Sequence, residues 1–473
     1  MPPTLALILC LISLAALLRF DPANEPNISP TLWVPLTWMF FLGSRSPSQW
    51  LTGQMGLSAQ ALEDGNPLDR VVFLVLILLA IGILISRSFK WGSFFARNLA
   101  LTALISYALV SVLWSDFPFI AFKRWFRDLG PYLVIFVILS DPRPLEAVRT
   151  VLRRLSYSLI LLSILLNKYF PQLSRQFDSW TGVGFFVGAT TTKNMLGLVC
   201  LISGLFFFWD TFTRWPDRKQ RRTKRIIAVN VVFFLLTIWL LRGAHCTTAS
   251  ICLILGCLVI TATGMKVFQR NPRLLNVLIP SSFCLYLILD FGLNLNGSMA
   301  QAVGKDPTLT ERTHVWAVLL GMHTNPLLGT GYQSFWLGPR LEWFAENSGV
   351  GLINEAHNGY LEIYLNLGLV GVALLVGFLV VSYRAICRKL AAHSNLAVFA
   401  LAAWIGLVFY NMSEAAFQGG LLWMMLLMGA VALPERAKKR VQRGAAFDSA
   451  GIPEHKPSLS LETMNDGDSH GYA

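Results

Sequence analysis

The sequence predicts an all-α polytopic membrane protein. Hydrophobic residues make up 54% of the 473 residues and charged residues 14%, and the mean hydropathy is +0.55. Apolar runs of roughly 17 to 25 residues recur along the chain, which is the length that crosses the hydrocarbon core of a bilayer. A soluble protein of this length carries about a quarter charged residues and shorter apolar runs. We therefore expect about 12 transmembrane helices, give or take one.

In chain order, the first apolar run (3–18) lacks the basic start of a signal peptide and is expected to be a retained span. The run 32–42 is too short to cross alone and is a candidate re-entrant segment. The remaining spans are expected at 71–85, 99–113, 132–139, 155–166, 195–209, 226–241, 250–265, 275–291, 361–381, 396–410 and 421–433.

Basic residues set the expected orientation of these spans. The net charge is +13, but Lys and Arg cluster in short loops between apolar runs, as in cytoplasmic membrane loops, so we expect no nucleic-acid partner. The densest basic segment, 214–225, is expected to be cytoplasmic, and counting spans from it places the region before residue 361 on the outer side. The cysteines fall mainly within apolar runs without a CxxC pair, so we predict neither a disulfide framework nor a metal site.

We accordingly divide the chain into four parts. These are N-terminal transmembrane helices (1–291), a large extracytoplasmic, periplasmic catalytic loop (292–360), C-terminal transmembrane helices (361–433) and a cytoplasmic tail (434–473). The tail is rich in Ser, Pro, Gly and charge and is expected to be disordered. Its Asp466 and Asp468 match the DxD metal site of some sugar transferases, but in such a tail we interpret the match as accidental.

Chemistry is expected in the loop, the longest region that cannot lie in a bilayer. Thr308 and Glu311 have capping-box spacing, so a helix is predicted over LTERTHVWAVLLGM. Arg312 would share the apolar face of this helix with Val315 and Leu319 instead of pointing to solvent. A planar guanidinium in that place suits an anion, and a snorkelling or ion-paired structural arginine is the alternative.

The segment EAHNGYLEIYLNLG follows, with His357 at the mouth of a span. Asn358, Glu362 and Asn366 recur every four residues and line one helical stripe. Polar groups at that depth are costly, so they are expected to face a cavity or a partner. We predict a functional role for His357 and Glu362, with a structural role as the alternative.

Further cations are expected on the same side. Lys123, Arg124 and Arg127 lie there against the positive-inside tendency, so either the span count is off at this point or they meet an anion. Lys193 and Asn194 open a span, where the free N–H groups and the helix dipole add to the lysine charge. That combination favours a phosphate, and an interfacial snorkelling lysine is the alternative.

Five motifs in this order carry a family resemblance: TTTKNMLG, AHCTTASICLILG, GKDPTLTERTHVW, NPLLGTGYQSFWLGPR and AHNGYLEIYLNLGLVG. They resemble the O-antigen ligase and O-antigen polymerase superfamily, and within it the ExoQ-type exopolysaccharide polymerases. The resemblance extends over about 43–433 and implies an architecture similar to C-type glycosyltransferases. The chain departs from it at Glu311, where relatives commonly carry glycine, and in the string 246–249.

The resemblance implies an integral glycosyltransferase of the bacterial inner (cytoplasmic) membrane, with its active site facing the periplasm. Its substrate would be a polyprenyl-pyrophosphate-linked oligosaccharide, with no metal and no cofactor. A polymerase passes the chain to another lipid-linked repeat unit, whereas a ligase passes it to lipid A core. Polysaccharide export or chain-length machinery would be the partner. The sequence leaves polymerase and ligase open, and a lipid-linked sugar transporter or flippase is the second alternative.

The residues then take roles in this reaction. Arg312 would stabilise the pyrophosphate leaving group. Neutral His357 would be the general base, with Glu355 or Glu362 as its orienting partner or substitute. The substrate- and pyrophosphate-binding candidates are Lys193, Asn194, Lys123, Arg124, Arg127, Arg340, Asn358 and Tyr360.

Overall fold

The structure, a computed structural model, describes residues 1–24, 28–53, 65–177, 182–265, 268, 274, 281, 309–350 and 352–433. Most of the expected span 275–291, the first part of the predicted loop and the predicted tail lie outside these residues. The described chain belongs to one compact unit, Met1–Leu433. It is mainly helical, as predicted, with a short antiparallel hairpin between β1 (Arg175–Phe177) and β2 (Gly184–Phe186).

Six of the described helices are long and apolar enough to cross a membrane. They are α1 (Pro3–Phe20), α5 (Pro67–Ser86), α10 (Pro144–Tyr169), α12 (Lys193–Arg214), α13 (Arg221–Ala244) and α20 (Gly359–Ala391). A seventh candidate is bent by 101° between α6 (Trp91–Arg97) and α7 (Leu99–Val110) with η2 (Ser111–Trp114). The protein is thus a multi-pass membrane protein, while the number of about 12 helices stays a prediction.

Shorter elements complete the described chain. Apolar helices of 10–17 residues occur at α2 (Trp33–Leu42) together with η1 (Pro30–Leu32), and at α14 (Thr247–Thr263), α21 (Asn395–Tyr410) and α22 (Leu421–Ala430). The others are α3 (Pro47–Thr52), α8 (Pro118–Asp128), α9 (Gly130–Leu139), α11 (Pro171–Ser174), η3 (Trp215–Asp217), α18 (Leu309–Gly321) and α19 (Gly338–Asn347). The predicted helix at LTERTHVWAVLLGM is confirmed as α18.

Helices that are apolar on every face form the centre of the unit. Every residue of α22 is buried, and so is nearly all of α9, because a helix without a polar face must be covered on all sides. α22 packs against α9 and α21, and α21 packs against α12 and α14. In contrast, Ala6 is the one buried residue of α1, and the leucines and isoleucines in the first two thirds of this helix are exposed, as expected for a lipid-facing span.

Helix α20 is broken inside its apolar stretch. Its 33 residues would extend about 50 Å, well beyond the roughly 30 Å of a hydrocarbon core. The break is at Gly368, which has φ +64° and ψ −168°. A Cβ at Gly368 would lie 2.2 Å from the carbonyl oxygen of Leu327, so only glycine fits. The segment after the break, 369–391, extends about 35 Å and is long enough to cross.

The loop 325–332 satisfies the backbone groups that this break frees. The carbonyls of Leu365 and Asn366 accept from the N–H groups of Thr330 (3.1 Å) and Gly331 (2.9 Å). The Tyr107 hydroxyl donates to the carbonyl of Leu367 on the same side (3.0 Å). After the break, the N–H of Leu369 donates to the carbonyl of Pro326 (2.9 Å) and that of Val370 to the carbonyl of Leu327 (3.2 Å). Irregular backbone at membrane depth is tolerated where such partners exist. The loop therefore fixes the first turns of α20.

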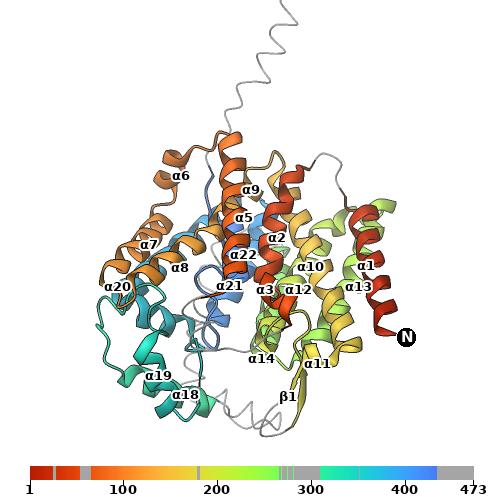
Figure 1. Cartoon of the computed structure of the whole chain (residues 1–473). Coiled ribbons are helices and arrows are strands. Elements are labelled where there is room, and N and C mark those ends of the chain that lie inside the picture. The colour runs from red at the N-terminus through yellow and green to blue at the C-terminus, as the bar shows by residue number, and fades with distance from the viewer. Residues whose placement is uncertain are drawn as a thin grey trace, which may run out of the picture. The chain divides into compact units, whose positions relative to one another are not determined.

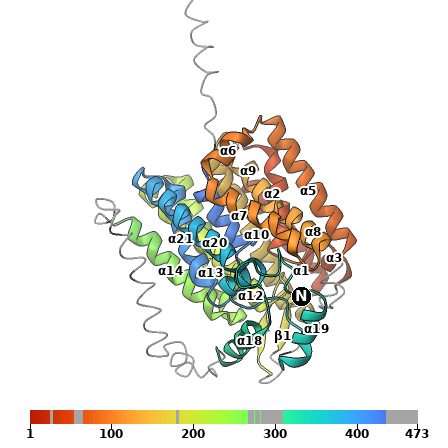
Figure 2. The same cartoon turned by 90° about the vertical axis from the view of Figure 1, so that its left-hand side faces the viewer.

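Helices α18 and α19 and the start of α20 share a second, smaller core. Its buried members are Val315, Leu319, Phe335, Trp336, Leu341, Phe344, Ala356 and Leu365. Figures 1 and 2 both place α18 and α19 at the end of the unit where β1 also lies, away from α6. This core positions Arg312 and His357, which lie on its edge.

Candidate functional site

A buried carboxylate, Glu414, joins the strongest candidates from the sequence. It lies in the loop 411–420 between α21 and α22, and its side chain is 5% exposed. One carboxylate oxygen, Oε1, accepts from Arg312 Nη2 at 2.8 Å and from Asn194 Nδ2 at 2.9 Å. The other, Oε2, lies 3.5 Å from Nδ1 of His357. Glu414 thus connects α18, the first turn of α12 and the segment before α20.

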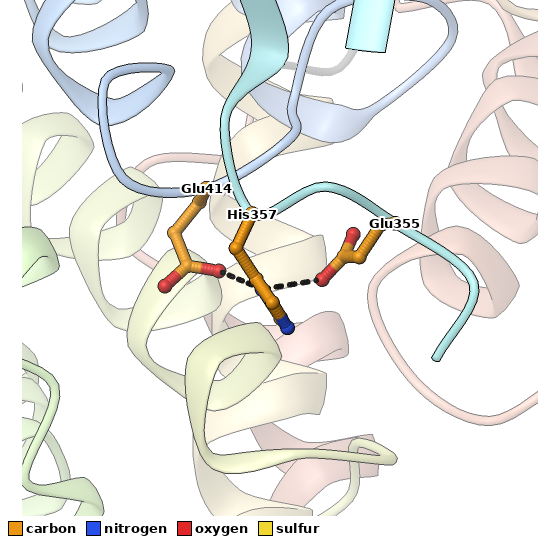
Figure 3. A group of neighbouring side chains, drawn as sticks. All are labelled: Glu355, His357 and Glu414. Atoms are coloured by element: carbon orange, nitrogen blue, oxygen red, sulfur yellow. Dashed lines mark ion pairs between the residues drawn. The ribbon is translucent and has the colours of Figure 1, made fainter. Parts of the chain in front are cut away.

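His357 lies between two carboxylates, as Figure 3 shows. Its Nδ1 is 3.1 Å from Glu355 Oε1 as well as 3.5 Å from Glu414 Oε2. The two carboxylates, Glu355 first and then Glu414, raise the pKa of His357 to about 9, although burial acts in the opposite direction. The imidazole is therefore protonated at neutral pH. This differs from the neutral base that the sequence argument assumes, and a base role requires the ring to lose that proton first.

The backbone around His357 is fixed by its neighbours. His357 has φ +47°, a left-handed conformation that is uncommon outside glycine and often found at functional sites. Asn358 caps α20 by accepting from the N–H groups of Tyr360 and Leu361. The N–H of Gly359 donates to the carbonyls of Asn411 and Glu414. The sequence HNG therefore holds the imidazole against the loop that carries Glu414, and Asn358 has a structural role in doing so.

Arg312 projects from α18 toward the same loop. Besides its ion pair with Glu414, it donates from Nη1 to the carbonyl of Ser413. Its side chain is 27% exposed, while Val315 and Leu319 of the same helix are buried in the second core. The ion pair named as the alternative for Arg312 is present, and its predicted role in anion binding stays a prediction.

Lys193 belongs to the same electrostatic neighbourhood. It opens α12 after the capping Thr192, and its Nζ lies 4.6 Å from the ring centre of Phe185. Burial raises the pKa of the nearby Cys246 thiol to about 11, and the charges of Glu414, Arg312 and Lys193 act on it as well. The structure therefore brings Asn194, Arg312 and His357 together around Glu414, with Lys193 in the same turn of α12 as Asn194.

The polar stripe of α20 faces a protein partner. Glu362 accepts from Trp336 Nε1 at 2.9 Å, from the N–H of Ala356 at 3.0 Å and from Asn366 Nδ2 at 2.9 Å. The Asn366 oxygen in turn accepts from the N–H of Phe335 at 3.2 Å. Glu362 thus ties the 335–336 segment to the residue before His357. Its expected role beside His357 is filled by Glu355, and a catalytic role for Glu362 stays a prediction.

The α8 cations form a second group with different partners. Arg124 donates to the carbonyl of Gln333, and Arg127 donates to the side-chain oxygen of Gln333 at 3.5 Å. Arg127 also pairs with Asp128 at 2.9 Å, while Lys123 lies over an aromatic ring of its own helix. These contacts hold α8 against the segment between α18 and α19.

Two further candidates make contacts within the protein. Arg340 pairs with Asp116 at 2.8 Å, although its buried Nη1 makes no hydrogen bond within the described residues. The Tyr360 hydroxyl donates to the carbonyl of Val408 at 3.1 Å, and its ring packs edge-on against Phe417. The binding roles assigned to both residues stay predictions.

A small open pocket lies between the α8 group and the loop 411–420. Its walls come from α7, α8, α9, α20 and α22 and are mostly apolar. The lining residues are Leu104, Ile105, Ala108, Trp125, Asp128, Leu129, Tyr132, Tyr332, Ile363, Leu367, Leu375, Phe417, Gln418 and Trp423. Phe417 and Gln418 follow Glu414 closely in the chain, so the pocket adjoins the loop that organises the site.

One trio at the site has the composition of a metal centre. The ligand atoms of Glu355, His357 and Glu414 all lie within 4.8 Å of one another. Carboxylate oxygens and an imidazole nitrogen suit a divalent cation. Arg312 already neutralises part of the Glu414 charge, however, so a cation would have to share that carboxylate. The expectation of metal independence remains to be tested.

Glu414 is not among the residues predicted from the sequence, because the predicted catalytic loop ends before residue 361. It is the lone acid in the long apolar stretch from 396 to 433. An acid that interrupts such a stretch is costly unless it is paired, and this would have been a usable signal.

Comparison with known proteins agrees with the resemblance seen in the sequence. Residues 179–376 match the family Wzy_C, described as O-Antigen ligase. The chain is also 26% identical over 315 residues to the exopolysaccharide production protein ExoQ of Rhizobium meliloti (strain 1021), covering 64% of this chain and 68% of that protein. The predicted family resemblance is confirmed. All of the residues that gather around Glu414, apart from Glu414 itself, lie inside the matched range.

Proposed function

We propose that this multi-pass membrane protein of the O-antigen ligase and ExoQ type polymerises polyprenyl-pyrophosphate-linked oligosaccharides into exopolysaccharide on the periplasmic face of the inner membrane. The observation that carries the proposal is the Glu414 cluster, in which an arginine, an amide and an imidazole converge on one buried carboxylate. The similar ExoQ protein is named for exopolysaccharide production, which favours a polysaccharide product over other glycans.

The cluster offers the two functions that a glycosyl transfer needs. The acceptor hydroxyl oxygen attacks the anomeric carbon of the donor, the bond from that carbon to the pyrophosphate breaks, and the hydroxyl proton must be accepted. Arg312 is placed to stabilise the negative charge on the departing pyrophosphate, with Lys193 as a second cation. The imidazole of His357 with its two carboxylates provides the group that receives the proton.

The charge state of His357 adds a step to this scheme. Its pKa of about 9 means that the ring begins protonated at neutral pH. The ring must release this proton to solvent before it can accept the hydroxyl proton, so the neutral base becomes available as the pH rises toward about 9.

The apolar pocket beside loop 411–420 supports a lipid-linked substrate. Its walls are mainly hydrocarbon and aromatic side chains, as suits contact with an isoprenoid chain. Polymerase and ligase share this requirement, so a ligase that transfers to lipid A core is the alternative. A lipid-linked sugar transporter would need no general base, so the presence of the His357 cluster favours a transferase over a transporter.

The test is complementation of cells that lack the gene. Wild type, His357→Ala, Arg312→Ala and Glu414→Gln are compared for membrane expression and for surface polysaccharide. We expect wild type to restore long chains and each variant to leave single lipid-linked repeats. Long chains that accumulate on the carrier lipid in the deletion strain would instead indicate a ligase.

His314→Ala is the matched control. His314 lies on α18 two residues from Arg312, is exposed, and contacts the carbonyl of Ser348 at 3.2 Å. It should complement fully. Full complementation by the three site variants as well would refute the catalytic assignment and favour transport.

A further inference from the structure

A second cluster of charges lies at the other end of α12. Asn194, which touches Glu414, is in the first turn of α12, and Asp210 and Arg214 are in its last turns. Sixteen residues of α-helix separate Asn194 from Asp210, or about 24 Å. The two clusters are therefore separate sites at opposite ends of one helix.

Asp210 is the centre of the second cluster. It accepts from Arg153, from Arg214 Nε at 2.9 Å and from Asn230 Nδ2 at 2.9 Å, and it lies 3.1 Å from Arg149 Nε. Its side chain is fully buried. Four partners from α10, α12 and α13 meet at this carboxylate, so it is the structural anchor of the cluster.

An open surface pocket lies beside this anchor, with an excess of positive charge in its walls. Four arginines line it: Arg149, Arg153, Arg154 and Arg214. The acids that can balance them are Asp21 and Glu146 in the wall and Asp210 beneath, so four cations face three anions and one positive charge remains. Partly buried charges that are left uncompensated are costly unless an anion joins them.

Arg154 is the cation with the least protein compensation. Its Nε is buried and makes no hydrogen bond within the described part of the chain. Its guanidinium lies 5.2 Å from the ring centre of Trp33. Arg153, in contrast, donates to Tyr157, Asn230 and Asp210. Arg154 is thus the group that a ligand would meet first.

One wall of the pocket belongs to the lipid-facing helix α1. Leu17 and Leu18 line it, and the earlier apolar side chains of α1 are exposed. The turn after α1 is held by Arg222, which donates to the carbonyls of Pro22 and Asn24. A ligand can therefore present an anionic head to the arginines and an apolar tail to α1.

We propose that this arginine-lined pocket binds a phosphate-bearing anion at the end of the helices opposite to the Glu414 site. A phosphodiester carries one negative charge, which matches the one unbalanced positive charge, and its oxygens suit guanidinium donors. The apolar wall favours the headgroup of an anionic phospholipid over free phosphate. Because the pocket adjoins the strongly basic segment 214–225, the bound lipid would be in the leaflet that this segment contacts.

The experiment uses the full-length protein in nanodiscs. Phosphatidylglycerol and phosphatidylcholine are mixed in equal amounts, and the lipid retained on the protein is identified by native mass spectrometry. A parallel thermal-unfolding series in phosphatidylcholine alone compares inorganic phosphate with chloride at equal ionic strength. We expect phosphatidylglycerol to be retained at least about 10-fold over phosphatidylcholine by wild type. Arg154→Gln should abolish that preference.

Arg218→Gln is the matched control, because Arg218 is exposed, belongs to the same basic segment and donates to the nearby carbonyl of Trp215. It should retain phosphatidylglycerol as wild type does. A thermal shift with phosphate and no lipid preference would assign the pocket to a free anion. The proposal would be overturned if wild type retains both lipids equally and phosphate does not change its melting temperature, whether or not Arg154→Gln folds. It would also be overturned if a folded Arg154→Gln keeps the preference of wild type for phosphatidylglycerol.

Discussion

The two ends of α12 carry clusters built from the same chemistry, a buried carboxylate surrounded by arginine and amide donors, yet they differ in what holds them. Asp210 is bound by partners on three regular helices, and its side chain is fully buried. Glu414 is in a loop, and two of its partners, Arg312 and His357, are 27% and 31% exposed. Asp210 itself is closed off by its partners, with the arginine-lined pocket beside it, whereas the Glu414 cluster is itself open to a ligand.

The difference separates a structural ion network from a candidate catalytic site. Charges on regular helices that satisfy one another fix the relative positions of those helices. At the Glu414 cluster, two of the charges are on loop segments and Arg312 and His357 are partly exposed, so a ligand can compete for these partners. Substitutions at Asp210 should therefore act on stability, and substitutions around Glu414 should act on activity.

Asp210→Ala should have the largest effect on stability. It would leave Arg149, Arg153 and Arg214 facing one another in a buried space and cost roughly 3–5 kcal/mol of unfolding free energy. We expect a large drop in melting temperature in detergent or failure to accumulate in the membrane. Asp217→Ala, an exposed acid in the adjoining η3, should melt as wild type. Equal melting of both variants would contradict the comparison.

Arg312→Ala should reduce activity more than stability. Loss of one well-placed charge at a leaving group lowers kcat by about 10²- to 10³-fold, while the partly exposed side chain contributes little to the fold. The measurement is transfer between lipid-linked oligosaccharides by purified protein, beside its melting temperature. Arg312→Lys should recover part of the rate. A variant that melts far below wild type would make Arg312 structural.

The pH dependence should report on His357. Its pKa is raised from an ordinary value of about 6.5 to about 9, so kcat/KM should increase with pH up to about 9 if the neutral ring is the base. Glu355→Gln removes the largest cause of the raised pKa and should shift the rise in kcat/KM to lower pH. A kcat/KM that does not change from pH 6 to 9, or a rise that Glu355→Gln does not shift, would exclude His357 as the base.

The same raised pKa links the charge of His357 to stability. A folded pKa above the unfolded one means that the protonated ring stabilises the fold below about pH 6.5, and that this stabilisation is lost as the pH rises through about 9. The melting temperature of wild type should therefore decline across this range. His357→Gln should show a smaller decline, and an equal decline in both proteins would rule out the linkage.

Removal of metal ions should not change activity. Arg312 supplies the positive charge at Glu414, so activity after dialysis against EDTA is expected to equal that of untreated protein. Activity that falls with EDTA and returns with a divalent cation would place a metal on Glu355, His357 and Glu414 instead.

Much of the fold was predictable because apolar runs and basic loops obey strong constraints. The helix at 309–321 followed from capping-box spacing, and the placement of Arg312 on its apolar side followed from helical periodicity. The break at Gly368 was not predictable, because hydropathy does not register a positive φ. The role of Glu414 depends on tertiary contacts across more than 100 residues from Arg312, and no local spacing encodes it.

The α20 break has a consequence for how the chain enters the membrane. The loop 325–332 is synthesised before α20. The groups that hydrogen-bond to the backbone at the break are therefore already present when the break is made. Until that loop has folded against it, the stretch around Gly368 has backbone N–H and C=O groups without hydrogen bonds, which are costly to bury in the hydrocarbon core. Insertion of α20 should accordingly stop at Gly368 and leave residues 359–367 at the membrane surface, where the site is then assembled.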